Sequence, residues 1–186
     1  MSSNIRTSKT YFMTSTSIIT ALICLLGPIS IPFGPIPVSL TNFIIYLSVI
    51  ILGLKGSTIS YLIYLLLGLA GLPVFSGFQG GISKLIGPTG GYLIGFIFVC
   101  IIGGFCSDKS KGKIKIPVIT TGIIISTLIT YLLGTLWFVK LTGTNFISAL
   151  SVCVFPFIPF DLLKIILALI IAFPIKSRLI KAKLLY

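Results

Sequence analysis

The sequence predicts an all-α integral membrane protein, a bundle of six transmembrane helices with both termini in the cytoplasm. Of its 186 residues, 56% are hydrophobic and only 9% are charged, with a mean hydropathy of +1.19. This composition is typical of membrane proteins and excludes a soluble globular domain. A crossing helix needs about 20 apolar residues, so the long charge-free stretches leave room for roughly six crossings. These stretches are residues 10–54, 56–83, 85–107, 116–139 and 141–160.

The expected helices follow the order of the apolar stretches. A turn at residues 28–37 ends the first helix, because four prolines in ten residues cannot continue it. Lys55 and Gly56 separate the second helix from the third. The connector at residues 141–159 is apolar and is predicted to fold back against the bundle. The six helices expected are residues 10–27, 38–54, 57–70, 89–105, 116–139 and 159–180.

The basic residues predict the orientation. A net charge of +12 suggests nucleic acid at first sight, but the basic residues flank apolar spans, as positive-inside topology requires. With both termini inside, Lys84, Lys140 and Lys164 lie on the outer side or within the membrane, and the other eleven of the fourteen basic residues are cytoplasmic. Those eleven are Arg6, Lys9, Lys55, Lys109, Lys111, Lys113, Lys115, Lys176, Arg178, Lys181 and Lys183.

Residues 71–95 hold eight glycines in twenty-five residues, in a chain that is otherwise apolar. Glycine and proline are poor helix formers, so this stretch is predicted to be irregular, with short re-entrant or hairpin structure. Irregular backbone facing lipid would leave its amide groups unsatisfied. The stretch is therefore expected to be buried or to line a cavity, which makes it part of a candidate site.

Only two acidic residues occur in the chain, and they stand in different surroundings. Asp108 belongs to the basic loop and is expected to be solvated. Asp161 and Lys164 are three residues apart in an apolar helix and share a face. Lys176 is expected to mark the inner boundary, which places Asp161 about 22 Å away, somewhat below the outer surface.

Two interpretations of the Asp161–Lys164 pair stand side by side. In one, Asp161 caps the last helix and the pair is structural. In the other, the pair faces an outward-open pocket, where the carboxylate accepts N–H bonds and the ammonium donates to a carbonyl. Thr41, Asn42 and the aromatic residue Phe33 are further candidates around such a pocket. The ligand-binding candidates are Asp161, Lys164, Gln79, Gly80, Lys84, Tyr92, Phe75 and Phe78.

Small side chains form rows on the first helix. Ser17 and Ala21 are four residues apart, and so are Thr20 and Cys24. Rows of small residues let membrane helices approach closely. They serve either packing within the bundle or docking of another membrane subunit.

The sequence lacks the residues that several classes of chemistry require. Four cysteines without a CxxC spacing, and no histidine, make a metal site improbable. The sequence has no GxxxxGK[ST] motif for ATP and no Ser/His/Asp set for hydrolysis. Neither an enzyme nor a cofactor is expected, and the composition favours a binding protein without its own energy source.

Three stretches resemble the BioY family, the biotin-binding S components of energy-coupling-factor (ECF) transporters. They are "IPFGPIPVSLTNF" (31–43), "LLLGLAGLPVFSGFQGGISKLIGPTGGYLIGF" (65–96) and "PFDLLKIILA" (159–168). The resemblance implies a single six-helix membrane domain over residues 1–186, in the plasma membrane of a prokaryote. It also implies capture of biotin from outside, with a membrane coupling subunit and two cytoplasmic ATPases as partners.

The resemblance gives the candidate residues roles. The ureido ring of biotin presents two N–H donors and one carbonyl acceptor, which suit Asp161 and Lys164. The carboxylate of biotin is expected within reach of Lys84, and the apolar parts against aromatic walls. Glycines would let the backbone approach the ligand, and the small residues of the first helix would dock the coupling subunit.

Three other functions compete with this interpretation. The chain could be an S component for another vitamin, such as riboflavin or thiamin, which competition with unlabelled vitamins would reveal. It could be a small intramembrane enzyme, which would turn over a bound compound. It could also be an assembly protein whose cavity binds nothing.

Overall fold

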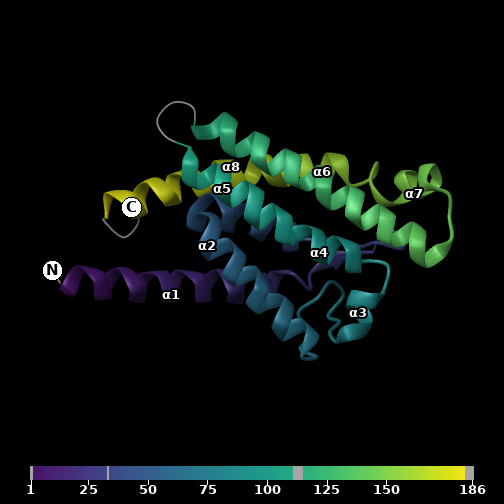
Figure 1. Cartoon of the computed structure of the whole chain (residues 1–186), viewed down its shortest axis with the longest axis horizontal. Coiled ribbons are helices and arrows are strands. Elements are labelled where there is room, and N and C mark those ends of the chain that lie inside the picture. Colours follow the sequence, from purple (N-terminus) through teal and green to yellow (C-terminus); the bar gives the residue numbers. More distant parts are fainter. Residues whose placement is uncertain (1, 33, 111–114, 183–186) are drawn as a thin grey trace.

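The protein is described by a computed structural model over residues 2–32, 34–110 and 115–182, with the side chains of residues 2–8 and 115 outside this description. Phe33, Lys111, Lys113 and Lys183, named above, lie outside the described ranges. Long helices run side by side in an elongated bundle (Figure 1). The short helices α3 and α7 lie at one end, called here the loop end, and the start of α1 and the end of α8 lie at the other, the terminal end.

Helices account for most of the chain. A two-stranded antiparallel ribbon, with Ser30 opposite Ser39, forms in the proline-rich turn. The helix that begins after the glycine-rich stretch is continuous from α4 through a π-helical turn, η1, into α5. The elements are α1 (Ser2–Leu26), β1 (Ser30–Ile31), β2 (Val38–Ser39), α2 (Thr41–Leu69), α3 (Ile82–Ile86), α4 (Gly90–Phe98), η1 (Val99–Gly103), α5 (Gly104–Lys109), α6 (Lys115–Thr142), α7 (Phe146–Cys153) and α8 (Ile158–Lys181).

Five helices of the described residues are long and apolar enough to cross a membrane. The expected all-α bundle is therefore present, and the second and third expected helices both fall within α2. Six crossings and cytoplasmic termini stay predictions. The spans are Lys9–Leu26, Thr41–Leu69, Gly90–Lys109, Ile116–Thr142 and Ile158–Lys181.

Helix α2 is folded back on itself at Gly53, whose φ of 68° and ψ of −161° are not helical. A straight helix would place Thr41 and Tyr64 about 35 Å apart, yet both line one pocket. The two halves of α2 are therefore antiparallel. The backbone N–H of Leu54 donates to Asp108 Oδ2 at 3.0 Å, so α5 holds the start of the second half. Asp108 is exposed, as expected of a solvated residue, but it also has this structural bond.

The glycines of "GPTGGYLIG" bring α4 against α6. A Cβ on Gly91 would collide with Trp137, and one on Gly95 would collide with Thr130, both residues of α6. These two glycines therefore serve helix packing, which corrects the expectation that they let the backbone approach a ligand. On the other side of the same contact, Gly134 leaves room for the ring of Tyr92.

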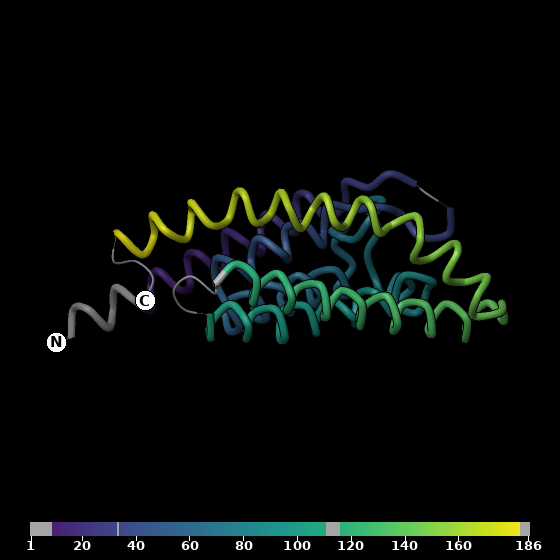
Figure 2. The backbone as a smooth tube through the Cα atoms, turned by 90° about the horizontal axis from the view of Figure 1, so that it is seen from above, coloured from purple at the N-terminus to yellow at the C-terminus, as the bar shows by residue number. Residues whose placement is uncertain are grey.

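The irregular stretch before α4 has the short hairpin structure expected of it. Phe75 and Gln79 pair through backbone hydrogen bonds of 2.9 and 3.3 Å, and the short helix α3 follows. The connector after α6 also folds back as predicted: α7 buries Ala149 and Cys153. Figure 2 shows α6 and α8 on opposite sides of the bundle, joined through α7 at the loop end.

Gly53→Ala is expected to destabilise the protein more than Gly143→Ala. Both glycines have a positive φ, so each alanine costs about 1–3 kcal/mol of backbone strain, and the ψ of −161° at Gly53 belongs to a region that is essentially restricted to glycine. A Cβ on Gly53 would also collide with the Asp108 carboxylate, whereas Gly143 has no atom within 4 Å of such a Cβ. Thermal unfolding midpoints in detergent measure the difference, and equal losses would contradict the role given to the turn.

Candidate functional site

A pocket opens at the loop end among α2, α4, α6 and α8, and β2 covers one side of it. It holds about 670 Å³ of empty space, counting its open mouth. Small-molecule sites are concave and mostly apolar with a few converging polar groups, and the lining of this pocket has that character. Its apolar wall consists of Ile36, Pro37, Val38, Leu93, Phe96 and Phe157, together with the ring of Tyr92.

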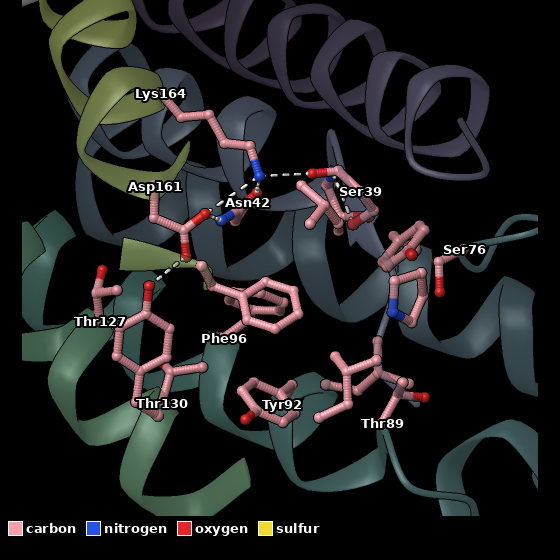
Figure 3. A pocket seen from close by; sticks show the side chains of 18 residues that line it. Ser39, Asn42, Ser76, Thr89, Tyr92, Phe96, Thr127, Thr130, Asp161 and Lys164 are labelled. Carbon is pink, nitrogen blue, oxygen red and sulfur yellow. Dashed lines mark hydrogen bonds and ion pairs between the residues drawn. The ribbon is translucent and has the colours of Figure 1, made fainter. Parts of the chain in front are cut away.

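Asp161 is buried at one end of the pocket and accepts three hydrogen bonds. Its Oδ1 accepts from Asn42 Nδ2 at 2.6 Å and from Lys164 Nζ at 3.1 Å. Its Oδ2 accepts from the Tyr131 hydroxyl at 2.6 Å (Figure 3). A carboxylate has about four acceptor sites, so one site on Oδ2 is left for a ligand N–H.

Lys164 is buried beside Asp161, as their spacing of three residues predicted. Its ammonium donates to Ser39 O at 2.8 Å, to Asn42 Oδ1 at 2.9 Å and to Asp161. All three N–H donors therefore have partners. A ligand carbonyl can gain a bond from Lys164 only by replacing one of them.

The capping interpretation of Asp161 is wrong. The N-cap of α8 is Phe157, which has no side-chain cap bond, and Asp161 lies inside the first turn. Its carboxylate is directed instead to α2 and α6, through Asn42 and Tyr131. A negative charge in the first turn of a helix is still favourable, because it faces the positive end of the helix dipole.

The opposite end of the pocket carries hydroxyl groups. Ser76 and Thr89 lie there, with Tyr92 and Phe96 between them and Asp161 (Figure 3). Tyr64 lines the pocket with its ring against Phe75. The Tyr64 hydroxyl is fully buried and interacts with the Thr41 side chain, but it makes no hydrogen bond of regular geometry among the described residues. The pocket thus has two polar ends and an apolar middle.

Some sequence candidates lie in this pocket and some do not. Asp161, Lys164 and Tyr92 line it, as do Thr41 and Asn42. The Tyr92 hydroxyl donates to Cys153 O at 2.8 Å, so the ring, rather than the hydroxyl, is available for contact with a ligand.

The two phenylalanine candidates do not line the pocket. Phe75 is fully buried in the core, where its ring fills the space that Gly68 leaves open. Phe78 is 67% exposed, with a φ of 57° that is uncommon for a bulky residue. The aromatic walls come from Tyr92, Phe96 and Phe157 instead.

The remaining ligand candidates line a second hollow at the loop end. Lys84 Nζ donates to Gln79 Oε1 at 2.8 Å, and partial burial lowers the pKa of the Lys84 amine. Thr89 lines both this hollow and the first pocket, so the two adjoin. The second hollow is lined by Pro35, Gln79, Gly80, Ser83, Lys84, Gly87, Pro88 and Thr89.

Sequence reasoning missed the contribution of α6. Thr127, Thr130 and Tyr131 all line the pocket. They lie at positions i, i+3 and i+4, which is the spacing of one helix face. This polar face in an apolar helix was the available signal. Ser39 contributes a backbone carbonyl, for which the sequence has no signal.

The rows of small residues on α1 point in two directions. Ser17 and Ala21 are exposed. Thr20 is buried and donates to Thr16 O at 2.9 Å and to Ser60 O of α2 at 3.4 Å. Cys24 is half-buried against the core. The first row is free for a partner, and the second packs α1 on α2.

Comparison with known proteins gives a consistent result. The BioY family model matches residues 1–181. The biotin transporter BioY of Thermotoga maritima is 40% identical over 86% of this chain and 92% of its own length. The probable biotin transporter BioY of Pyrococcus horikoshii is 40% identical over 77% of this chain and 83% of its own length.

One solved structure has the same fold. It is the crystal structure of the S-component for biotin from an ECF-type ABC transporter. The TM-score is 0.78 at 30% sequence identity, and the match covers 91% of this chain and 92% of that chain.

Tyr131→Phe is expected to lower the free energy of unfolding of the ligand-free protein by about 1.5–3 kcal/mol, because it removes a hydrogen bond to a buried carboxylate. Tyr64→Phe is the matched control. It removes a buried pocket hydroxyl that makes no hydrogen bond of regular geometry, so it should change stability far less. Denaturant titration in detergent measures both variants. Equal stability of the two would contradict the network described for Asp161.

Proposed function

Since the chain belongs to the BioY family, we propose that it is the biotin-binding S component of a vitamin uptake transporter. It captures biotin from outside and delivers it inward, as a multi-pass protein of the cell membrane and not as an enzyme. The observation that carries the proposal is the two-ended pocket. Asp161, Lys164 and Asn42 form one polar end, an apolar middle follows, and hydroxyl groups form the other end.

The ureido ring of biotin suits the Asp161 end. One ring N–H donates to the acceptor site left on Asp161 Oδ2. The ring carbonyl needs a donor, and Asn42 is placed to supply one: one N–H of its Nδ2 donates to Asp161, and the second, which interacts with the Tyr46 hydroxyl in the ligand-free protein, would turn to the ligand. The proposal therefore adds Asn42 to the Asp161–Lys164 pair. Lys164 holds the carboxylate in place through its hydrogen bond to Asp161 Oδ1.

The rest of biotin suits the rest of the pocket. The thiophane ring and the valeryl chain are apolar and would lie against Tyr92, Phe96 and Phe157. Burial of this surface contributes about 25 cal/mol per Å². The Tyr64 hydroxyl, which makes no hydrogen bond of regular geometry in the ligand-free protein, would gain one from the ligand or from a water molecule bound with it.

The partners proposed are a membrane coupling subunit and two cytoplasmic ATPases. A transporter of this kind needs an energy source, and this chain has no nucleotide-binding motif. The coupling subunit would dock on α1, where Ser17 and Ala21 are exposed on one face and permit a close approach of helices.

Biotin binding by calorimetry in detergent tests the function, with riboflavin and thiamin as controls. The expected result is one-to-one binding of biotin alone. Asp161→Asn should weaken it at least about thirtyfold, because loss of one partner of a buried charge pair costs about 2–5 kcal/mol. Asp108→Asn alters the only other acidic residue, at the terminal end, and should leave the affinity unchanged.

Two results would contradict this assignment. A folded protein that binds riboflavin or thiamin but not biotin would be an S component for another vitamin. A loss of affinity in Lys84→Ala as large as that in Asp161→Asn would contradict the placement of the buried end of the ligand.

Ala21→Phe is expected to reduce assembly with the coupling subunit and the ATPases while biotin binding is retained, because a large ring prevents close helix approach. Leu22→Phe is the control, a bulky change at the next, partly exposed position of α1. Co-purification of the full complex measures assembly. Normal assembly of Ala21→Phe would remove this face from the docking surface.

A further inference from the structure

A cleft lies between α6 and α8, next to the pocket, and holds about 380 Å³ of empty space, counting its open side. Its floor consists of four buried residues, Thr127, Tyr131, Asp161 and Ile165. Its rim consists of four exposed apolar side chains, Ile124, Leu128, Ile158 and Leu162. Three of the floor residues, Thr127, Tyr131 and Asp161, also line the pocket, so they form a thin wall between the two spaces.

The open side of this cleft faces the hydrocarbon of the bilayer. Its eight lining residues all belong to two of the membrane spans, Ile116–Thr142 and Ile158–Lys181. With Lys176 at the membrane boundary, residues 158–165 lie about 16–27 Å along α8, in the half of a roughly 30 Å hydrocarbon core nearer the loop end. Both helices run along the long axis of the bundle (Figure 2). The cleft therefore has the direction in which lipid acyl chains cross a leaflet.

Water is a poor occupant of the cleft. Thr127 Oγ1 donates to Ile123 O at 2.8 Å and is paired with the Tyr46 hydroxyl at 3.0 Å. The Tyr131 hydroxyl donates to Asp161. Both hydroxyl donors of the floor are thus used within the protein, and the rest of the lining is apolar apart from the Asp161 carboxylate. Apolar cavities exclude water and accept apolar ligands.

A helix of another protein is also a poor occupant. With its side chains, a helix is about 10–12 Å wide. The floor of the cleft, by contrast, is bridged from α6 to α8 by the single hydrogen bond between Tyr131 and Asp161. A narrow, unbranched and flexible apolar chain is the occupant that fits.

We propose that this cleft is a lipid site, which binds one acyl chain of a phospholipid from the leaflet nearer the loop end. The chain covers the side of the Tyr131–Asp161 bond that the pocket does not. It keeps water from that bond, and a hydrogen bond is stronger in such a dry environment. The lipid is thereby part of the wall at the charged end of the pocket, whichever ligand the pocket binds.

Labelling with a photoreactive lipid tests the site. The full chain is reconstituted in nanodiscs with a phospholipid that carries a diazirine in one acyl chain, and adducts are mapped by peptide mass spectrometry after illumination. Adducts are expected in excess at Leu128 and Leu162 on the rim. Leu132 and Ile166 are the reference positions, because they are similarly exposed on the same two helices but lie outside the cleft. Equal labelling at all four positions would mean ordinary contact with the bilayer and would overturn the site.

Leu128→Phe is expected to abolish the excess labelling at Leu162, because the larger side chain fills the cleft from the opposite helix. Leu132→Phe is the matched control, the same substitution about one turn along α6 at a similarly exposed position, and it should preserve that excess. Leu162→Phe, with labelling read at Leu128, is the reciprocal variant. Excess labelling that persists in both Leu128→Phe and Leu162→Phe would show that the chain lies elsewhere.

A third result would also overturn the lipid site. If Leu132 and Ile166 are labelled while Leu128 and Leu162 are protected, another protein surface covers the cleft. The readout is the position of lipid adducts and not the binding of biotin. The lipid site can therefore fail while the proposed function stands, and the reverse also holds.

Discussion

The buried charge of Asp161 is the constraint on which the rest of the loop end depends. Burying an ion pair in an apolar bundle costs several kcal/mol per ion unless further hydrogen bonds satisfy the remaining groups. Here the bonds come from four elements: Asn42 of α2, Ser39 of β2, Tyr131 of α6, and Lys164 of α8 itself. Satisfying one carboxylate and one ammonium therefore fixes where these elements meet.

The same network holds α6 and α8 together. An apolar cleft lies between these helices, with Thr127, Tyr131 and Asp161 also lining it. Among the described residues, the bond from Tyr131 to Asp161 is the only side-chain hydrogen bond between the two helices. Elsewhere each packs on other parts of the bundle: α6 on α4, through Gly91 and Gly95, and α8 on α2. Near the pocket, α6 and α8 are thus joined by a polar contact, whereas further along the bundle α2 packs directly on η1 and α5.

This arrangement distributes polarity in a way that suits a small amphipathic molecule. The buried end holds the Asp161–Lys164 pair and its hydrogen-bond partners, with one acceptor site left on Asp161 Oδ2. The middle is apolar and includes the rings of Tyr92, Phe96 and Phe157. The other end carries the hydroxyl groups of Ser76 and Thr89. Such a pocket can satisfy polar groups of a ligand at its two ends while the apolar part of the ligand lies between them.

The sequence by itself determined the membrane fold class, the order of the helices, and Asp161 and Lys164 as the paired charges of the site. Composition and spacing suffice for these, because hydropathy and the helical repeat act locally along the chain. It was also sufficient to assign the family, on stretches that include the glycine-rich motif. The role of that motif was not readable, since Gly91 packs on Trp137 and Gly95 on Thr130, which are 46 and 35 residues further along the chain.

The tertiary structure decided which polar groups share a cavity. It brought Asn42, Tyr131 and the Ser39 carbonyl to the charged pair, placed Phe75 in the core, and put Lys84 in a separate hollow. It also divided the small residues of α1 into an exposed row and a packed row, and made α2 a hairpin at Gly53. The contacts that Asn42, Tyr131 and Ser39 make with the charged pair join residues 30 to 125 positions apart. Their partners are chosen by helix packing and by the need to satisfy buried polar groups, which no local pattern of residues encodes.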